Sequence, residues 1–91
     1  MPECCVKIIN KLGLHARAAA KLVKIASEFE SEITITNEAN GNSADAKSIL
    51  SLLTLCGSQG TELKIETIGS DGEIALVEVE KIFREGFREE I

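Results

Sequence analysis

The chain has 91 residues, of which 44% are hydrophobic and 27% are charged, so we expect one folded domain over residues 1–91. The net charge is −5 and the aromatic residues are three phenylalanines, a composition that argues against a nucleic acid as partner. The chain begins with no signal-peptide pattern, and no apolar run approaches the roughly 20 residues of a membrane helix. We therefore expect a cytoplasmic protein that does not enter a membrane.

The first half of the chain alternates between strand and helix patterns. Short β-branched stretches with period-two alternation predict strands, and apolar residues at three- and four-residue steps predict a helix. The elements expected here are a strand at Cys4–Ile9, a loop at Asn10–Leu14, a helix at Ala16–Phe29, a strand at Glu32–Asn37, a turn at Asn40-Gly41 and a weak strand at Asn42–Ala44.

The second half repeats this alternation with shorter elements. We expect a helix at Asp45–Leu55, a turn at Cys56–Gly60, a strand at Thr61–Ile68, a break at Gly69–Gly72, a helix at Glu73–Glu85 and a helix end with a short tail from Gly86. The order β-α-β-β-α-β-α predicts an α+β fold in which one antiparallel sheet packs its apolar face on the helices. The expected core residues are Val6, Ile8, Ala19, Leu22, Val23, Ala26, Phe29, Ile33, Ile35, Leu63, Ile65, Thr67, Ala75, Val79, Ile82 and Phe83.

The three cysteines do not predict a disulfide framework. Cys4, Cys5 and Cys56 are odd in number and contain no Cys-x-x-Cys pair, so we expect reduced, structural thiols. Adjacent Cys4 and Cys5 would point to opposite faces of a strand. With a single histidine and no metal-ligand spacing, we expect neither a metal site nor a cofactor.

The single histidine, His15, stands between a predicted strand and a predicted helix. A lone histidine is most often a surface residue without chemistry, but a helix start offers unpaired N–H groups and a partial positive charge that suit an anion. Gly13 lets the backbone approach a ligand closely, and Arg17 offers donors that match a phosphate. Because imidazole is also a nucleophile, His15 is a candidate for accepting and holding a phosphoryl group.

Other enzyme classes fit less well. A Cys-His nucleophile pair would need a proximity that the sequence does not show, and the nucleotide-binding pattern Gly-x-x-x-x-Gly-Lys is absent. The chain is also short for a substrate cleft. A small protein that carries one phosphoryl group between larger partners suits these observations better.

Three runs of residues resemble the motifs of a known family. The run Asn10-Lys11-Leu12-Gly13-Leu14-His15-Ala16-Arg17 is similar to the active-site signature of HPr, the histidine-containing phosphocarrier of the bacterial phosphotransferase system. The runs Ala46-Lys47-Ser48-Ile49-Leu50 and Gly60 to Ile65 match further along, and the resemblance covers essentially the whole chain. It implies an open-faced β-sandwich with four antiparallel strands and three helices.

The resemblance also implies roles for residues around His15. His15 would accept a phosphoryl group on Nδ1 from enzyme I, which phosphoenolpyruvate charges, and would pass it to a histidine of a IIA protein or domain. Arg17 and the backbone N–H groups of Ala16 and Arg17 would hold the phosphate. These donors at a helix start would stabilise charge on the transferring group.

The apolar second helix predicts a docking patch beside His15. A short helix that is apolar all round cannot bury every side, so we expect exposed apolar residues rather than core alone. The expected patch comprises Ala20, Ile49, Leu50 and Leu53. Arg17, Lys21 and Lys24 would add a basic rim for acidic partners. Ser48 matches the position that a dedicated kinase phosphorylates in many family members, although an ordinary helix-start serine is an equally weighted interpretation.

Two positions depart from the family pattern. Ala18 stands where most members have proline, and Leu12 stands where members of the sugar branch often carry a small polar residue. The run Asn10-Lys11-Leu12-Gly13 and the ending Gly86-Phe87-Arg88-Glu89 resemble the nitrogen-related branch more closely. Ala18 and Leu12 leave open a regulatory binding module of the same fold with little phosphoryl flux. A third alternative is a metal- or thiol-reactive protein based on Cys4, Cys5 and His15.

Overall fold

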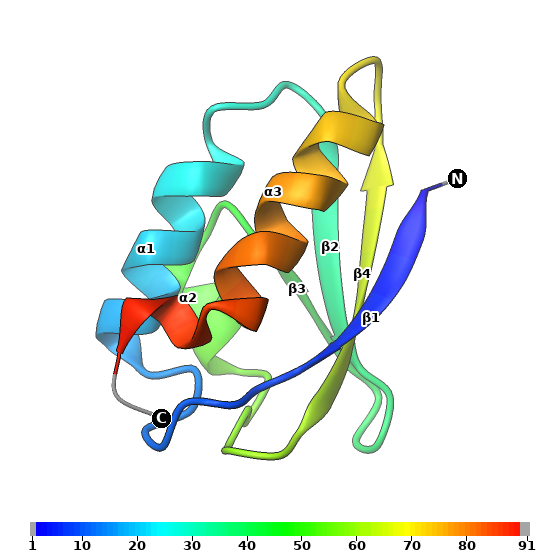
Figure 1. Ribbon diagram of the computed structural model, residues 1–91. Helices are drawn as coiled ribbons and strands as arrows, with labels where there is room; N and C mark the ends of the chain where they lie inside the picture. Colours follow the sequence, from blue (N-terminus) through cyan, green and yellow to red (C-terminus); the bar gives the residue numbers. More distant parts are fainter. Residues whose placement is uncertain (1, 90–91) are drawn as a thin grey trace.

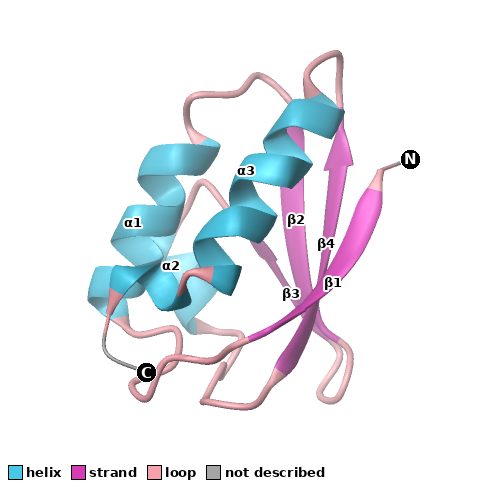
Figure 2. Ribbon diagram, in the orientation of Figure 1, coloured by secondary structure: helices cyan, strands magenta, loops and turns pink. Residues whose placement is uncertain are grey.

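The computed structural model describes residues 2–89 and shows a four-stranded antiparallel sheet with helices packed on one face (Figures 1 and 2). The strand order across the sheet is β1-β4-β2-β3. The strands are β1 (Glu3–Lys7), β2 (Glu32–Asn37), β3 (Asn42–Asp45) and β4 (Glu62–Ile68), and the helices are α1 (Ala16–Ala26), α2 (Ile49–Leu53), α3 (Gly72–Arg84) and the 3₁₀ turn η1 (Gly86–Arg88). The predicted α+β fold and element order are therefore confirmed.

The core lies between the sheet and the helices, as the periodicity predicts. Ile35 of β2 and Ile65 of β4 are opposite each other in the register, and both are fully buried. α1 contributes Leu22 to this layer and α3 contributes Phe83, both without solvent contact. The expected core residues are buried except for Val23 and Phe29, which are partly buried against the rest. Burial of one face per element holds the two layers together.

The second helix is shorter than its sequence predicts. α2 covers Ile49–Leu53 instead of Asp45–Leu55, because Asp45 is the last residue of β3 and is paired with Thr34 of β2. The N–H of Ala46 continues this pairing by bonding to the Ile33 carbonyl at 3.0 Å. Backbone groups that are already bonded to the sheet cannot join a helix, so α2 begins only after Ser48.

The first helix also ends early, at Ala26 rather than Phe29. The N–H groups of Glu28 and Phe29 bond to carbonyls three residues back, at 3.1 and 3.2 Å. Such bonds describe tight turns that continue the helix direction without its regular pattern.

The thiols differ from the expected structural role at two of three positions. The structure shows all three cysteines free, with Cys4 half-buried and both Cys5 and Cys56 exposed. Burial, and then the nearby Glu80 carboxylate, raises the pKa of the Cys4 thiol to about 11. Cys4 therefore packs as a small apolar residue, whereas Cys5 and Cys56 lie outside the core.

Residues 2–89 bear on two further predictions, which concern metal ligands and membrane-spanning helices. In that range, three or more His, Cys, Asp or Glu side chains do not come together as metal ligands would. Within the same range, no helix is both long enough and apolar enough to cross a membrane.

Candidate functional site

A tight loop between β1 and α1 places His15. Gly13 has φ +67°, and its N–H bonds to the Asn10 carbonyl at 3.1 Å. The next residue, Leu14, donates to the carbonyl of Gly57 at 2.7 Å and is buried. A Cβ at Gly13 would collide with that same carbonyl oxygen, so both the conformation and the space require glycine. Hydrogen bonds from Gly13 and Leu14 therefore hold the loop in place immediately before His15.

His15 is the N-cap residue of α1, with an extended backbone (φ −83°, ψ 178°). Its carbonyl accepts the helix bond from the Ala19 N–H at 2.8 Å, but its side chain does not cap the helix. The N–H groups of Ala16 and Arg17 belong to the first turn, where intrahelical partners are lacking by geometry. The ring thus stands beside free donors and the positive end of the helix dipole.

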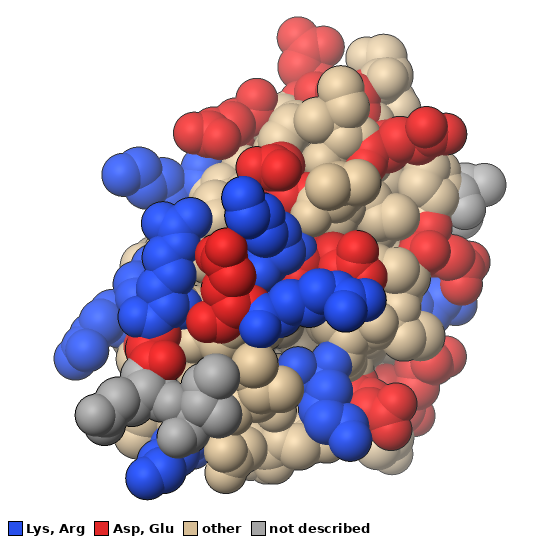
Figure 3. Space-filling model, viewed as in Figure 1, with Lys and Arg blue, Asp and Glu red and all other residues tan. Residues whose placement is uncertain are grey.

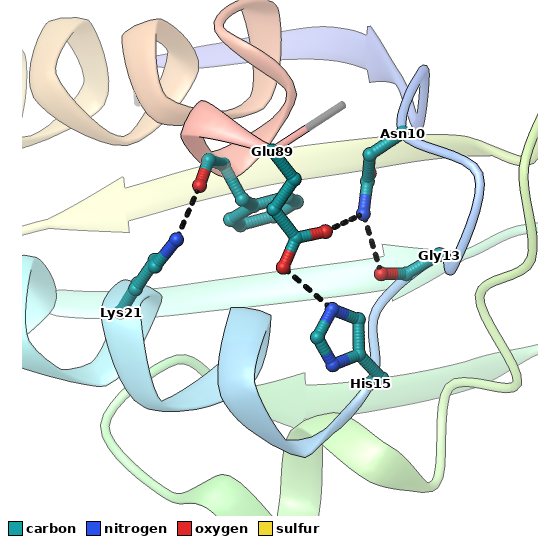
Figure 4. Close-up of polar contacts among 6 residues, drawn as sticks. Asn10, Gly13, His15, Lys21 and Glu89 are labelled. Carbon is teal, nitrogen blue, oxygen red and sulfur yellow. Dashed lines mark hydrogen bonds and ion pairs between the residues drawn. The ribbon is translucent and has the colours of Figure 1, made fainter. Parts of the chain in front are cut away.

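The ring contacts a glutamate from the other end of the chain. His15 Nε2 lies 2.7 Å from Oε2 of Glu89, and the two side chains are 24% and 11% exposed (Figure 4). The other ring nitrogen points away from Glu89 (Figure 4). One edge of the imidazole is therefore held by a carboxylate, while Nδ1 points away from that carboxylate.

Asn10 connects the loop to this glutamate. Its Nδ2 donates to the Gly13 carbonyl at 2.8 Å and to Glu89 Oε1 at 2.9 Å, and the side chain is fully buried (Figure 4). Burial alone would raise the pKa of the Glu89 carboxyl, but hydrogen bonds from Asn10 and His15 outweigh it and hold that pKa below its usual value. Both carboxylate oxygens therefore have a donor.

The segment that carries Glu89 is anchored just before it. Phe87 of η1 is fully buried and packs edge-on against Phe83 of α3, with ring centroids 4.9 Å apart. Lys21 of α1 donates from Nζ to the Phe87 carbonyl at 2.7 Å (Figure 4). These contacts place the C-terminal segment across α1 (Figure 1).

Arg17 shares a pocket with Glu89. Its side chain is exposed and faces a surface pocket of about 470 Å³ whose lining residues are Lys11, Leu12, Arg17, Lys21, Arg88 and Glu89. Four of these six lining residues are cations, and the fifth charged residue is the carboxylate that contacts His15. Local positive charge thus collects beside the histidine although the chain is acidic overall.

The predicted docking residues are exposed on the surfaces of α1 and α2. α2 packs against α1, and its Leu50 is 79% exposed. Ala20 is exposed on α1, and Ile49 and Leu53 are exposed on α2. Ser48 is the N-cap of α2, and its Oγ accepts a hydrogen bond from the Ser51 N–H at 3.3 Å.

The two departures from the family pattern occupy different environments. Ala18 is fully buried in the first turn of α1, so it contributes to the core. Leu12 is 69% exposed and lines the pocket beside Glu89. Ala18 is therefore a packing position, whereas Leu12 lies on the surface beside Glu89.

The structure is an α+β sandwich whose single histidine opens the first helix, and comparisons with known proteins identify a family with this arrangement. The family model described as the PTS HPr component phosphorylation site matches residues 2–85. The phosphocarrier protein HPr of Xylella fastidiosa is 40% identical over 90 residues, with 99% of each chain covered. The phosphocarrier protein NPr of Escherichia coli is 39% identical over 85 residues, with 93% of each covered.

The structural comparison agrees with the sequence comparisons. The crystal structure of HPr-C-His from Thermoanaerobacter tengcongensis superposes with a TM-score of 0.92 at 37% identity, covering all of both chains. The chain belongs to the HPr family of phosphocarriers of the phosphotransferase system. The near-equal identities to an HPr and an NPr do not separate the sugar branch from the nitrogen branch, so that assignment stays a prediction.

Sequence reasoning missed Asn10 and Glu89 as members of the site. Asn10 opens the active-site signature and Glu89 closes the ending that favours the nitrogen branch, but neither run predicts a contact with His15. Glu89 lies 74 residues from His15 and outside the residues that the family model matches. No spacing rule links positions so far apart, so only the folded chain brings this carboxylate to the ring.

Proposed function

We propose that this chain accepts a phosphoryl group on Nδ1 of His15 from enzyme I, charged by phosphoenolpyruvate, and passes it to a IIA protein or domain. The observation that carries this proposal is the position of His15 at the start of α1, with Nδ1 directed away from Glu89 (Figure 4). The free N–H groups of the first helical turn and the Arg17 guanidinium would hold the phosphate.

The site is suited to a carrier because the residues that would bind phosphate lie at the surface. The side chain of His15 is partly exposed and Arg17 is exposed, so a donor or acceptor protein can reach the phosphorus from outside. A carrier must not stabilise its adduct too strongly, since onward transfer would then stall. Donors at an exposed helix start supply moderate stabilisation of this kind.

The direct test is phosphorylation by enzyme I and phosphoenolpyruvate. The parent chain should gain one phosphoryl group that is labile in acid and stable in base, and His15→Ala should gain none. Because His15 is the single histidine of the chain, the variant removes every imidazole acceptor. Equal labelling of His15→Ala would refute the assignment.

The exposed apolar residues of α2 are proposed to dock the partners. Leu50 is largely exposed, so Leu50→Ser should leave the fold intact while it weakens binding to enzyme I and slows phosphoryl transfer. Val77 of α3 is also exposed and provides the matched control, Val77→Ser. Titration calorimetry should show weaker binding, and labelling kinetics slower transfer, for Leu50→Ser. Both measurements should match the parent for Val77→Ser.

Ser48 is proposed as a regulatory phosphorylation site within this docking surface. It caps α2 directly before Ile49 and Leu50, so about two negative charges there would face any acidic partner. Ser48→Asp should slow phosphoryl transfer from enzyme I without unfolding α2, because aspartate is also a good N-cap. Transfer at the parental rate would argue against regulation at this residue.

A regulatory binding module with little phosphoryl flux is the second candidate. The exposed Leu12 and the apolar face of α2 favour it, because both could bind a partner without any role for His15. Under this alternative, His15→Ala binds partners as the parent does and the parent chain carries no phosphate between proteins. Phosphoryl shuttling by the parent chain would exclude it.

A further inference from the structure

The short contact between His15 and Glu89 determines which ring nitrogen carries the proton. An ionised carboxylate has only acceptors, so an imidazole nitrogen 2.7 Å away from it must be a donor. Nε2 therefore carries the hydrogen in the neutral ring, and Nδ1 retains its lone pair. This assignment follows from the chemistry of the two groups.

Glu89 is held ionised and oriented by its surroundings. Asn10 donates a hydrogen bond to the second carboxylate oxygen and another to the Gly13 carbonyl. Its side chain is fully buried. The hydrogen bonds to the carboxylate keep the pKa of Glu89 below its usual value despite burial. The loop that presents His15 and the carboxylate that contacts it are therefore linked by a single buried side chain.

The backbone before Glu89 has an unusual conformation that directs it to the ring. Gly86, Phe87 and Arg88 all have positive φ, at 60°, 56° and 59°. The left-handed region disfavours side chains by roughly 1–2 kcal/mol per residue, so Phe87 and Arg88 hold it only because other contacts compensate. Burial of Phe87 and the bond from Lys21 supply that compensation.

We propose that Glu89 is a positioning residue that holds the neutral imidazole of His15 with Nδ1 free to attack phosphorus. The inference rests on the proposed function, since it concerns the same acceptor atom. The Nδ1 lone pair forms the new N–P bond, the bond from phosphorus to the donor's leaving group breaks, and its electron pair departs with that group. The ring keeps its Nε2 proton and gains a positive charge, which the Glu89 carboxylate stabilises.

The first test observes the ring without any phosphoryl donor. With a single histidine in the chain, ¹⁵N labelling of histidine reports on His15 alone. At about pH 8, where an imidazole is ordinarily neutral, the parent should show a detectable Nε2–H proton and an unprotonated Nδ1. Glu89→Ala should lose that proton signal to solvent exchange, and its two nitrogen shifts should move toward each other.

The matched control is Glu85→Ala. Glu85 is an exposed glutamate four residues earlier, paired with Arg88 at 3.2 Å and not in contact with the ring. Its removal changes the charge by the same amount in the same segment, so the ring signals should remain parental. Glu89→Gln retains a carbonyl acceptor without the charge, and should keep the Nε2–H signal.

The second test measures phosphoryl acceptance from enzyme I by the same variants. Glu89→Ala should accept about tenfold more slowly, the lower end of the loss seen when a carboxylate that orients a metal-binding histidine is removed. Glu89→Gln should fall between Glu89→Ala and the parent, and Glu85→Ala should match the parent. Circular dichroism confirms that each variant is folded.

The two tests separate this inference from the proposed function. Unchanged ring signals in Glu89→Ala overturn the inference whatever the parent does with enzyme I, and an unchanged acceptance rate overturns it as well. If the parent takes no phosphate but shows the held Nε2 proton, the proposed function fails while the positioning of His15 by Glu89 is supported.

Discussion

At the scale of single residues, Gly13 is the position where the loop before His15 tolerates no side chain. Its φ is +67°, and a Cβ would collide with the Gly57 carbonyl that bonds to Leu14. Gly13→Ala should therefore lower the free energy of unfolding by about 2 kcal/mol or more, from left-handed strain together with the displaced contact. Denaturant titration measures this loss. Gly41→Ala also has positive φ but meets no atom within 4 Å, so it should cost less.

Asp71 makes part of the stability depend on pH. Its carboxylate accepts from the Ser31 hydroxyl and from the N–H groups of Glu30 and Ser31, each at 2.9 Å, which holds its pKa below the usual 3.8. Because the folded-state pKa is depressed, this stabilisation is complete above the unfolded pKa and is lost as pH falls through the folded one.

Asp71→Asn should therefore be less stable than the parent near neutral pH, and the difference should shrink once the pH falls below about 4. Thermal unfolding at a series of pH values measures the difference. Glu28→Gln, at an exposed position just after α1, should follow the parent throughout. A gap between Asp71→Asn and the parent that is constant with pH would contradict the argument.

At the scale of elements, η1 joins the core to the functional site. Phe87 packs against Phe83 of α3, and Glu89 follows two residues later. Phe87→Ala should cost about 3–5 kcal/mol of unfolding free energy, the usual range for removing a buried phenylalanine. It should also release Glu89 from the ring, which the loss of the His15 Nε2–H signal would report. Phe87→Leu should retain most of the stability and the ring contact.

At the scale of the whole molecule, charge is unevenly distributed. The chain carries a net charge of −5, yet Lys and Arg gather over α1 and the C-terminal segment, while Asp and Glu dominate the upper and right-hand edges of that view (Figure 3). Opposite charges on two proteins raise their rate of encounter, and salt screens this effect. The surface beside His15 is thus suited to an acidic partner.

Association with enzyme I should therefore slow as the salt concentration rises. Lys24→Glu, on the exposed face of α1, should reduce the association rate several-fold at low salt and much less at high salt. Stopped-flow or surface-plasmon measurements separate the association rate from dissociation. Lys7→Glu makes the same charge change on β1, on the face of the sheet opposite Val6, and should have little effect.

Local patterns predicted most elements of the fold. Each element buries one face, which gives alternating apolar residues in β2 and β4 and helical spacing in α1 and α3. These patterns are visible within a short stretch of sequence. The prediction of α2 was wrong at its start because Asp45 pairs with Thr34, a contact between strands that helix periodicity does not reveal. The exposure of Cys5 and Cys56 likewise depends on where the strand and the turn lie in the folded molecule.

The candidate site likewise contains residues that the sequence predicts and residues that only the folded chain brings together. His15, Ala16 and Arg17 follow one another in the chain, so the sequence by itself determined that a histidine with phosphate donors opens a helix, and the family motif named its chemistry. The tertiary structure alone decided that Glu89, 74 residues away, contacts Nε2 and that Asn10 links Glu89 to the loop before His15. The physical reason is range: helix starts and strand alternation are properties of neighbouring residues, whereas the orientation of an imidazole depends on a partner that only chain folding brings into reach.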